Sequence, residues 1–518
     1  MKLSRRTVVA TALASPLILR TARAADDLRA RIKVNTGNTR GAIDRKLYGN
    51  FIEHLGRCID GGVFQEGSPL SNAAGYRRDV LEAAQGLNVS QLRWPGGNFS
   101  SNYHWMDGIG PRDERPRRLE MAWGTVETNR FGTHEFLDYA EQVKAEPYIC
   151  ANLGTGTWTE AQQWVEYCNS AEDTAITRLR RQNGRKDPWK VKYWGLGNEM
   201  DGPWQMGHRS ADDYGKFALE AAKLMRLTDP NVKLIAAGSS NYAAGVDWSL
   251  WNRTVVEHLQ TYMDYLAIHL YVGNPNDDFG EFLASSRLMD DKIETTAKVI
   301  EGALAGRTDG HKIYIAFDEY NVWYRARGDK ERGRRILEER YNLEDALVVA
   351  TFLNSLVNHA DVVKIANMAQ LVNVIAPIFT SDQGLYLQTI YYPLQLFAKN
   401  AHGQSLKLDV DVPGYNTKQW HDVPYLDVSG AVDGNTLVLN VVNRHRDQAI
   451  EATIALEDKS FAGGSLGIAE VNGPGIKAGN DFGKTEVSAK TSTAKAQGKS
   501  VQHRFPAHSF TQLTARLA

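Results

Sequence analysis

Two glutamates end apolar runs of the kind that form buried strands. Glu199 closes the stretch KVKYWGLGNE, and Glu319 closes IYIAFDE. A carboxylate in such a place loses hydration unless it has a partner or a chemical task. Two carboxyl groups that face each other across a cleft, one protonated and one ionised, are the catalytic pair of glycoside hydrolysis. A separation of about 5 Å would allow one of them to act as the nucleophile.

Other polar side chains occur at the ends of similar runs or in the loops that follow them. If these side chains converge on one rim, burying each of them costs desolvation energy. A functional rim would explain why the cost is tolerated. We therefore predict one polar site built from several strand ends. Besides Glu199 and Glu319, its candidate residues are Glu53, His54, Arg93, Asn98, Asn198, His269, Tyr271, Tyr320, Asn367 and Gln370.

The apolar runs recur eight times along the chain. Most are continuously apolar rather than alternating, as strands covered on both faces are. The predicted strands are 47–53, 89–94, 147–152, 191–198, 233–239, 265–269, 313–319 and 362–368.

Stretches with helical spacing separate these strands. Strand followed by helix, repeated eight times, predicts a (β/α)8 barrel with its active site at the carboxyl ends of the strands. A doubly wound open sheet is the alternative, but the first strand is not followed by a G-x-G-x-x-G turn. The predicted helices are 77–85, 133–144, 161–179, 211–227, 251–262, 282–301 and 342–358.

The hydrophobic pattern of the sequence changes after Lys399. Short alternating runs such as NTLVLNVVNRH are punctuated by Gly, Asp and Asn, which predicts an antiparallel β-sandwich over 400–518. The catalytic barrel is then placed at 43–399. The segment 25–42 is strand-like at 29–37, and we predict that this N-terminal strand joins the β-sandwich.

Residues 1–24 have the composition of an export signal peptide. Arg5 and Arg6 precede an apolar stretch at 8–19 and the small-residue site Ala22-Arg23-Ala24. The pattern is typical of twin-arginine signals, with the Sec route as the alternative. The stretch is shorter than the about 20 residues that span a bilayer. We expect an exported protein, periplasmic or secreted.

The composition argues against several partners and cofactors. A formal net charge of −1 on 518 residues gives no electrostatic reason to expect nucleic acid or an anionic membrane. The three cysteines cannot all pair, so we expect buried thiols, with one disulfide as the alternative. The histidines show no ligand spacing such as H-E-x-x-H. We expect no metal and no cofactor, because two carboxyl groups and water suffice.

Six motifs, in order along the chain, resemble those of one enzyme family. They are YGNFIEHLGRCIDGG, LRWPGGNFSSNYHWMDGIGPRDERPRR, WGLGNEMDGPWQMGH, HLYVGN, FDEYNVWY and ANMAQLVNVI. The set resembles the α-L-arabinofuranosidases of glycoside hydrolase family 51, and the C-terminal region resembles that family's β-sandwich. Asn-Glu after one strand with Glu after a later one is common to a clan of retaining glycosidases. The RWPGGNF loop and the FIEH strand are more particular to the family.

The resemblance implies roles for the matching residues. Glu199 in GNEM corresponds to the general acid/base, which must be protonated when the glycosidic oxygen arrives. Glu319 in FDEYN corresponds to the nucleophile, and Asn198 to a partner of the sugar 2-hydroxyl. Further correspondences are sugar-hydroxyl contacts for Glu53, Asn98 and Gln370, a covering loop for Trp123, and supporting roles beside the carboxylates for Arg93, His269 and Tyr271.

The resemblance also implies an activity. It is that of a retaining, exo-acting hydrolase that removes terminal non-reducing α-L-arabinofuranosyl groups from arabinan, arabinoxylan and arabino-oligosaccharides. One alternative is the same chemistry on another sugar, as in an endo-β-glucanase, a β-xylosidase or a galactofuranosidase. The other is a non-catalytic carbohydrate-binding protein. Family members commonly form hexamers, so the resemblance also implies a homo-oligomer.

Overall fold

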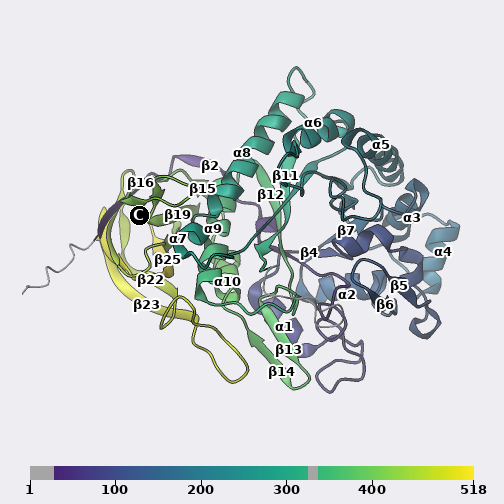
Figure 1. Cartoon of the computed structure of the whole chain (residues 1–518), viewed down its shortest axis with the longest axis horizontal. Coiled ribbons are helices and arrows are strands. Elements are labelled where there is room, and N and C mark those ends of the chain that lie inside the picture. Colours follow the sequence, from purple (N-terminus) through teal and green to yellow (C-terminus); the bar gives the residue numbers. More distant parts are fainter. Residues whose placement is uncertain (1–27, 325–336) are drawn as a thin grey trace, which may run out of the picture.

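The protein consists of an α/β barrel and a β-sandwich that lie side by side (Figure 1). The structure is a computed structural model that describes residues 28–324 and 337–518. In Figure 1 the barrel and its helices fill the centre and right, and the sandwich, largely yellow, lies on the left. This arrangement confirms the predicted fold class.

Eight parallel strands of the described residues close the barrel in the order β10-β11-β12-β3-β4-β7-β8-β9. Each predicted strand overlaps one of them. Side chains of these strands are buried on both faces, between the barrel interior and the surrounding helices, which explains the continuously apolar runs. Their bounds are β3 Gly49–Phe51, β4 Gln91–Trp94, β7 Glu146–Ala151, β8 Tyr193–Leu196, β9 Lys233–Ala237, β10 Tyr265–Val272, β11 Tyr314–Val322 and β12 Val363–Ala369.

The helices follow the predicted positions with two divisions and one addition. The predicted helix 161–179 is two helices, because Thr174 caps a new one by accepting the N–H of Thr177. The predicted helix 282–301 is also divided. Helix α10 is missing from the prediction because YYPLQLF is apolar without a helical period. The bounds are α1 Arg78–Leu87, α2 Thr133–Val143, α3 Trp158–Asn169, α4 Ala175–Gln182, α5 Ala211–Thr228, α6 Trp248–Leu259, α7 Phe279–Leu283, α8 Ser286–Ala303, α9 Leu343–Asn358 and α10 Tyr391–Asn400.

Helix α9 fixes the sandwich to the barrel. Every residue from Leu343 to Val357 is buried, and a helix that is buried on all sides must be covered on all sides. On the sandwich side, Asn354 Nδ2 donates to the Asp427 carbonyl at 3.1 Å. Asn354 Oδ1 accepts a hydrogen bond from Ser429 Oγ at 2.6 Å. These contacts place β19 directly against the helix.

The sandwich contains a four-stranded and a seven-stranded sheet among the described residues. Strand β1 pairs in parallel with β21, from Leu28 opposite Ile450 to Val34 opposite Leu456, whereas the other sandwich pairs are antiparallel. The sheet orders are β16-β1-β21-β24 and β2-β15-β19-β20-β25-β22-β23. The bounds are β1 Leu28–Val34, β2 Thr39–Ala42, β15 Gln404–Leu406, β16 Asp409–Asp411, β19 Leu426–Asp433, β20 Thr436–Asn443, β21 Ile450–Leu456, β22 Phe461–Asn472, β23 Ser488–Gly498, β24 Ser500–Phe505 and β25 Ser509–Arg516.

A long connection between β4 and α2 supplies part of the barrel mouth. Buried Arg115 in this connection pairs with Glu135 of α2 at 3.0 Å, which anchors the loop to the barrel. The connection contains the short helices η2 Asn98–Asn102, η3 Trp105–Gly108 and η4 Arg112–Glu114 and the hairpin β5 Arg118–Glu120 with β6 Thr125–Glu127. Other short elements are η1 Arg45–Tyr48 and the hairpins β13 Ile378–Ser381 with β14 Gly384–Leu387 and β17 Gly414–Tyr415 with β18 Val423–Pro424.

Three expectations from the sequence concern the termini and the cysteines. The predicted signal segment, 1–24, lies outside the described residues. No helix within the described ranges is long and apolar enough to cross a membrane. Cys58, Cys150 and Cys168 are buried free thiols, as expected.

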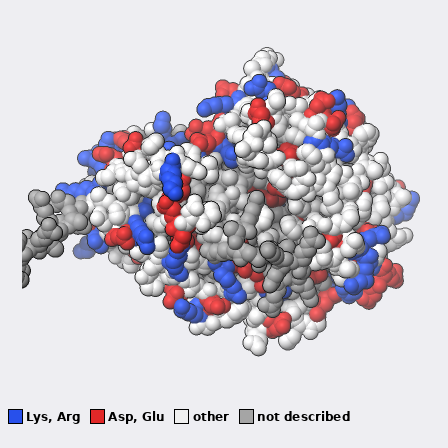
Figure 2. Space-filling view, in the orientation of Figure 1, with Lys and Arg blue, Asp and Glu red and all other residues white. Residues whose placement is uncertain are grey.

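On the face shown in Figure 2, basic and acidic side chains are interspersed, in keeping with the near-zero net charge.

We predict that Ile32→Ala lowers the free energy of unfolding of the sandwich by about 2–4 kcal/mol. Ile32 is fully buried between the sheets, so the change leaves a cavity. Urea unfolding followed by circular dichroism measures the loss. The neighbouring exposed residue gives the matched control, Arg31→Ala, which should change little. Equal stabilities of the two variants would contradict the packing of β1.

Candidate active site

The predicted site residues converge at the carboxyl-terminal ends of the barrel strands. Glu319 lies on β11, His269 and Tyr271 lie on β10, and Glu199 follows β8 by three residues. Glu199 has a φ of 45°, in the left-handed region, which costs a residue with a side chain about 1–3 kcal/mol. Such strain is typical of functional sites. This turn brings the Glu199 carboxylate over the barrel mouth.

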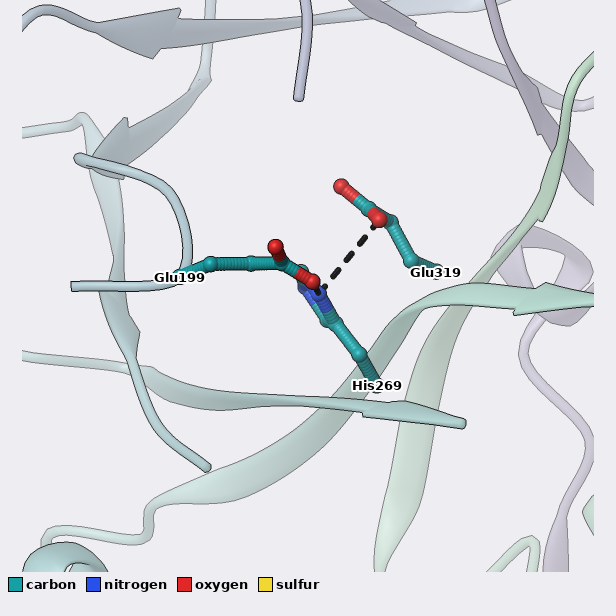
Figure 3. A group of neighbouring side chains, drawn as sticks. All are labelled: Glu199, His269 and Glu319. Carbon is teal, nitrogen blue, oxygen red and sulfur yellow. Dashed lines mark hydrogen bonds and ion pairs between the residues drawn. The ribbon is translucent and has the colours of Figure 1, made fainter. Parts of the chain in front are cut away.

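The two candidate carboxylates approach each other on either side of one imidazole (Figure 3). His269 Nδ1 lies 2.9 Å from Glu199 Oε1 and 3.4 Å from Glu319 Oε2. One polar atom from each of the three side chains lies within 4.8 Å of the other two. The side chains of Glu319 and Glu199 are only 5% and 12% exposed, so their charges interact with little screening.

Arg93 of β4 bonds to both segments that bear the candidate carboxylates, at Glu319 of β11 and at Asn198 beside Glu199. Its Nη1 donates to Glu319 Oε1 at 2.6 Å, and its Nη2 donates to Asn198 Oδ1 at 2.6 Å. The guanidinium also lies over the Phe51 ring, 4.7 Å from the centroid. A planar, permanently charged group with several donors fixes both partners at once. Arg93 therefore sets the distance between the end of β8 and β11.

Asp318 is a third carboxylate beneath the pair, and sequence reasoning missed it. Its Oδ2 accepts a hydrogen bond from Tyr148 Oη at 2.7 Å, and its Oδ1 lies 3.2 Å from His269 Nε2. Consecutive residues of a regular strand point to opposite faces. Asp318 and Glu319 nevertheless both contact Arg93, because the register shifts between Phe317 and Tyr320 and the strand bulges there.

Each of the two main carboxylates has one further donor. Tyr271 Oη donates to Glu319 Oε2 at 2.9 Å. Trp204 Nε1 donates to Glu199 Oε2 at 2.6 Å, and the Trp204 side chain is half exposed at the opening of the site. Trp204 was also missed, although it stands in the motif GNEMDGPW. A tryptophan five residues after a strand-end glutamate was the available signal.

Glu53 forms a second polar centre with three of its neighbours. Its Oε1 accepts hydrogen bonds from the Phe99 backbone N–H and from Trp123 Nε1, both at 3.1 Å. Its Oε2 accepts one from Gln370 Nε2 at 2.8 Å. Burial, with the negative charge of Glu319, raises the pKa of Glu53 to about 8. The raised pKa favours the neutral acid form of Glu53 at pH 7.

The remaining predicted residues lie at the edge of the site or behind it. Asn98 begins η2 and is half-buried, next to the Phe99 N–H that reaches Glu53. His54 lies behind the site: its Nε2 accepts from Trp94 Nε1 at 3.0 Å, so its Nδ1 donates to Glu127 at 2.9 Å. Two other candidates pack behind the rim. Tyr320 lies edge-on to Phe317 and Phe352, and Asn367 donates a hydrogen bond to Gln91.

The charges around His269 favour its protonated form in the resting site. Burial lowers the pKa of His269, but the charges of Glu319, Asp318 and Glu199 outweigh it and raise that pKa well above its ordinary value. Burial raises the pKa of Glu199, but His269 and Trp204 outweigh it and hold that pKa below the ordinary value. Burial and the charge of Glu199 leave the pKa of Glu319 raised. We expected Glu199 to be protonated when the glycosidic oxygen arrives; its lowered pKa beside His269 favours the carboxylate in the resting site.

Glu199, His269 and Glu319 are close enough together to be metal ligands. Their lone pairs are engaged, however, by N–H and O–H groups of Trp204 and Tyr271 and by the imidazole itself. Binding a metal through histidine requires the neutral ring, and the raised pKa of His269 opposes that form. The arrangement is better suited to moving protons than to holding a cation.

Known proteins match the chain over most of its length. The profile described as alpha-L-arabinofuranosidase 1 domain matches residues 83–290, and that of the alpha-L-arabinofuranosidase C-terminal domain matches 318–509. An intracellular exo-alpha-(1->5)-L-arabinofuranosidase of Halalkalibacterium halodurans is 41% identical over 84% of this chain and 88% of its own. A probable alpha-L-arabinofuranosidase C of Aspergillus niger is 40% identical over 94% and 97%.

The chain belongs to the α-L-arabinofuranosidases of glycoside hydrolase family 51. Solved structures agree: the arabinose complex of the alpha-L-arabinofuranosidase from Thermotoga maritima superposes with a TM-score of 0.87 at 37% identity, over 94% of this chain and 100% of that one. A family 51 enzyme from Bifidobacterium longum gives 0.88 at 32% identity, over 94% and 100%. The suspected resemblance is confirmed, and this family 51 member is an enzyme.

The prediction of an exported protein is wrong. Relatives from Halalkalibacterium halodurans, Bacillus subtilis and Streptomyces lividans, 40–42% identical to this chain, are named intracellular. The prediction rested on paired arginines before a short apolar run. Such a run is a compositional pattern alone, so it discriminates weakly between an export signal and other N-terminal segments.

Asp318→Asn is expected to lower the pKa of His269, because it removes one of the negative charges that raise it. The stabilisation from His269 is complete below its unfolded pKa of about 6.5 and is lost as the pH rises through the folded pKa. That loss should therefore be complete at a lower pH in the variant. Titration of the imidazole by NMR measures the shift. Asp309→Asn, at an exposed loop carboxylate, is the control, and equal His269 titrations in both would exclude this role for Asp318.

Glu53→Gln is expected to flatten the pH dependence of stability between about pH 4.5 and 8. The folded protein keeps Glu53 protonated up to about pH 8, whereas the unfolded chain ionises it near 4.3. The wild type therefore loses stability across this window as the pH rises. Urea unfolding at several pH values compares wild type, Glu53→Gln and the exposed control Glu114→Gln. Parallel curves for wild type and Glu53→Gln would refute a buried neutral acid.

Proposed function

We propose that this family 51 enzyme is a retaining, exo-acting α-L-arabinofuranosidase that works by double displacement. The observation that carries the proposal is the placement of Glu199 and Glu319, with carboxylate oxygens within 4.8 Å of each other. Retaining glycosidases hold their two carboxyl groups about 5–5.5 Å apart, and inverting ones about 6.5–9.5 Å, to leave room for water. The short separation supports attack by one carboxylate on the sugar.

In this mechanism Glu319 is the nucleophile. Arg93 and Tyr271 each donate to one of its oxygens, which holds the carboxylate in one orientation. One oxygen attacks the anomeric carbon as the bond to the leaving oxygen breaks. When Glu319 bonds to the sugar, it loses its negative charge. This charge is one of those that raise the pKa of His269, so its loss makes the His269 proton easier to transfer.

Glu199 is the general acid and then the general base. His269 Nδ1 lies 2.9 Å from Glu199 Oε1, so transfer of the His269 proton along this hydrogen bond gives the protonated acid. Glu199 passes the proton to the leaving oxygen and becomes a carboxylate. It then takes a proton from the water that attacks the glycosyl ester, Glu319 leaves, and Glu199 returns this proton to His269. No cofactor takes part in this balance.

The remaining residues are proposed to bind the sugar. Glu53 as a neutral acid, together with Gln370, offers donors and acceptors to furanose hydroxyls. Asn198 is held by Arg93 and contacts the 2-hydroxyl, while Asn98 borders the same space and Trp123 covers it. Exo action is supported by the relatives named exo-alpha-(1->5)-L-arabinofuranosidase.

Relatives named exo-alpha-(1->5)-L-arabinofuranosidase support terminal α-L-arabinofuranosyl groups of arabinan and arabino-oligosaccharides as substrates, with arabinoxylan as a further one. Glucanase or xylosidase action has less support. The bifunctional glucanase-xylanase CelM2 matches with a TM-score of 0.58 at 13% identity, which is a likeness of fold alone. The hexamer implied by the resemblance stays a prediction, which light scattering of the purified protein tests.

The expected activity is hydrolysis of aryl α-L-arabinofuranosides with an α-configured first product, detected by NMR. Glu319→Ala should abolish turnover. Glu199→Ala should lose about 10²–10⁴-fold, and less with a good leaving group, which needs little protonation. Glu257→Gln, at an exposed glutamate of α6, is the control and should keep full activity.

Three outcomes would refute the proposal. A β-configured first product would exclude retention. Turnover by Glu319→Ala at the wild-type rate would exclude the nucleophile. Sugar binding without hydrolysis of any furanoside would favour the non-catalytic alternative, and a rapid fall in the viscosity of a linear glucan would favour an endo-acting enzyme.

A further inference from the structure

A cavity of about 480 Å³ lies where the barrel meets the sandwich, outside the candidate active site. Its barrel wall is the segment from Asn276 to Gly280, which leads from β10 into α7, and Figure 1 shows α7 against the sandwich. Tyr415 Oη donates to the Gly280 carbonyl at 3.0 Å, so the two walls are fixed to each other. This volume falls in the range of small-molecule sites, about 300–1,000 Å³.

The sandwich wall of the cavity is a row of three rings. Tyr415 and Tyr425 stack with centroids 5.0 Å apart, and Tyr425 lies 4.7 Å from the His445 ring. His445 Nδ1 accepts the backbone N–H groups of Asp447 and Gln448. The proton of the neutral ring is therefore on Nε2, which is a donor. The row combines apolar ring surface with polar tips, as carbohydrate sites do.

Arg444 adds a buried polar group to this wall. It is 3% exposed, and its Nη2 donates to Ser286 Oγ at 2.7 Å and pairs with Asp427. Its Nε, in contrast, is buried without a hydrogen-bond partner in the described structure. Buried N–H groups are nearly always paired. Arg444 contributes to the cavity wall, but its Nε is itself inaccessible, so this residue braces the wall and the ligand contacts fall to its exposed neighbours.

The balance of charges favours an uncharged ligand. Arg444 pairs with Asp427, and Lys477 pairs with both Asp277 and Glu344. Exposed Arg446 and Asp278 add one charge of each sign to the wall. The wall presents donors from His445 and Arg446 together with acceptors from Asn276 and Asp278. Sugar hydroxyls both donate and accept, so a neutral sugar satisfies both kinds of group, whereas an anion or a cation satisfies one.

The cavity is also near the catalytic groups along the chain. Asn276 is five residues from Tyr271, so their Cα atoms are at most about 18 Å apart. We propose that this cavity is an accessory site for neutral oligosaccharide, which holds a part of the polysaccharide chain remote from the cleaved bond. The proposal rests on the proposed function, since the site serves a polymeric substrate.

Asn276→Trp tests the proposal by filling the cavity from an exposed loop position. The ratio of kcat/KM on arabinan to kcat/KM on an aryl α-L-arabinofuranoside should fall roughly fivefold to tenfold, as expected when one or two hydrogen bonds to the sugar are lost. The aryl substrate carries a single sugar, so it lacks the further sugars that the proposed site would hold. Asn231→Trp, at an exposed loop outside the cavity, is the control and should leave the ratio unchanged. An unchanged ratio in Asn276→Trp would overturn the proposal.

Binding separates this proposal from the proposed function. In a Glu319→Ala background, calorimetric titration with arabinotriose should show a weak second site that Asn276→Trp abolishes and that Arg446→Ala weakens. If arabinotriose bound at a single site both in Glu319→Ala and in the double variant with Asn276→Trp, the cavity would hold solvent only. An altered oligomeric state in Asn276→Trp, with binding unchanged, would assign the cavity to contact between copies instead. If the wild type failed to cleave furanosides, the proposed function would fall while this titration still decided the cavity.

Discussion

The site depends on one buried guanidinium. Arg93 is removed from water and meets Glu319, Asp318 and Asn198, which come from two different parts of the barrel. A buried positive charge is stable only when such partners surround it. The partners in turn orient His269, and His269 orients Glu199. The geometry of both candidate catalytic carboxylates is therefore a consequence of where β4 delivers a single arginine.

The same cluster changes how acid/base chemistry is divided among residues. A protonated acid and an ionised nucleophile were expected as properties of two separate glutamates. In the structure, His269 lies between three carboxylates, whose charges raise its pKa and favour its protonated form. In the proposed mechanism, the acid then acts as a pair, Glu199 with His269.

The barrel and most of the rim were predictable because buried parallel strands leave a simple signal: a continuous apolar run that ends in a polar residue. Glu199, Glu319 and Glu53 all follow that rule. Asp318 was not predictable, since alternation places it on the face opposite Glu319 and only the bulge reverses this. Trp204 was missed because it reaches Glu199 from an irregular loop. The pKa shifts of Glu199, His269 and Glu319 depend on their burial and on the charges around them in the folded protein, which no residue pattern encodes. The roles of the site residues and the domain limits remain predictions.

The parallel pairing of β1 with β21 has a consequence for how the protein is made. Leu28 and Ile450 are neighbours in space but 422 positions apart in the chain. On the ribosome, β1 emerges first and its partner appears only after the whole barrel has been synthesised. The N-terminal strand must therefore wait unpaired while the barrel folds, with its apolar residues exposed to other nascent chains. Contacts of such long range form slowly, so we expect the sandwich to be completed late in folding.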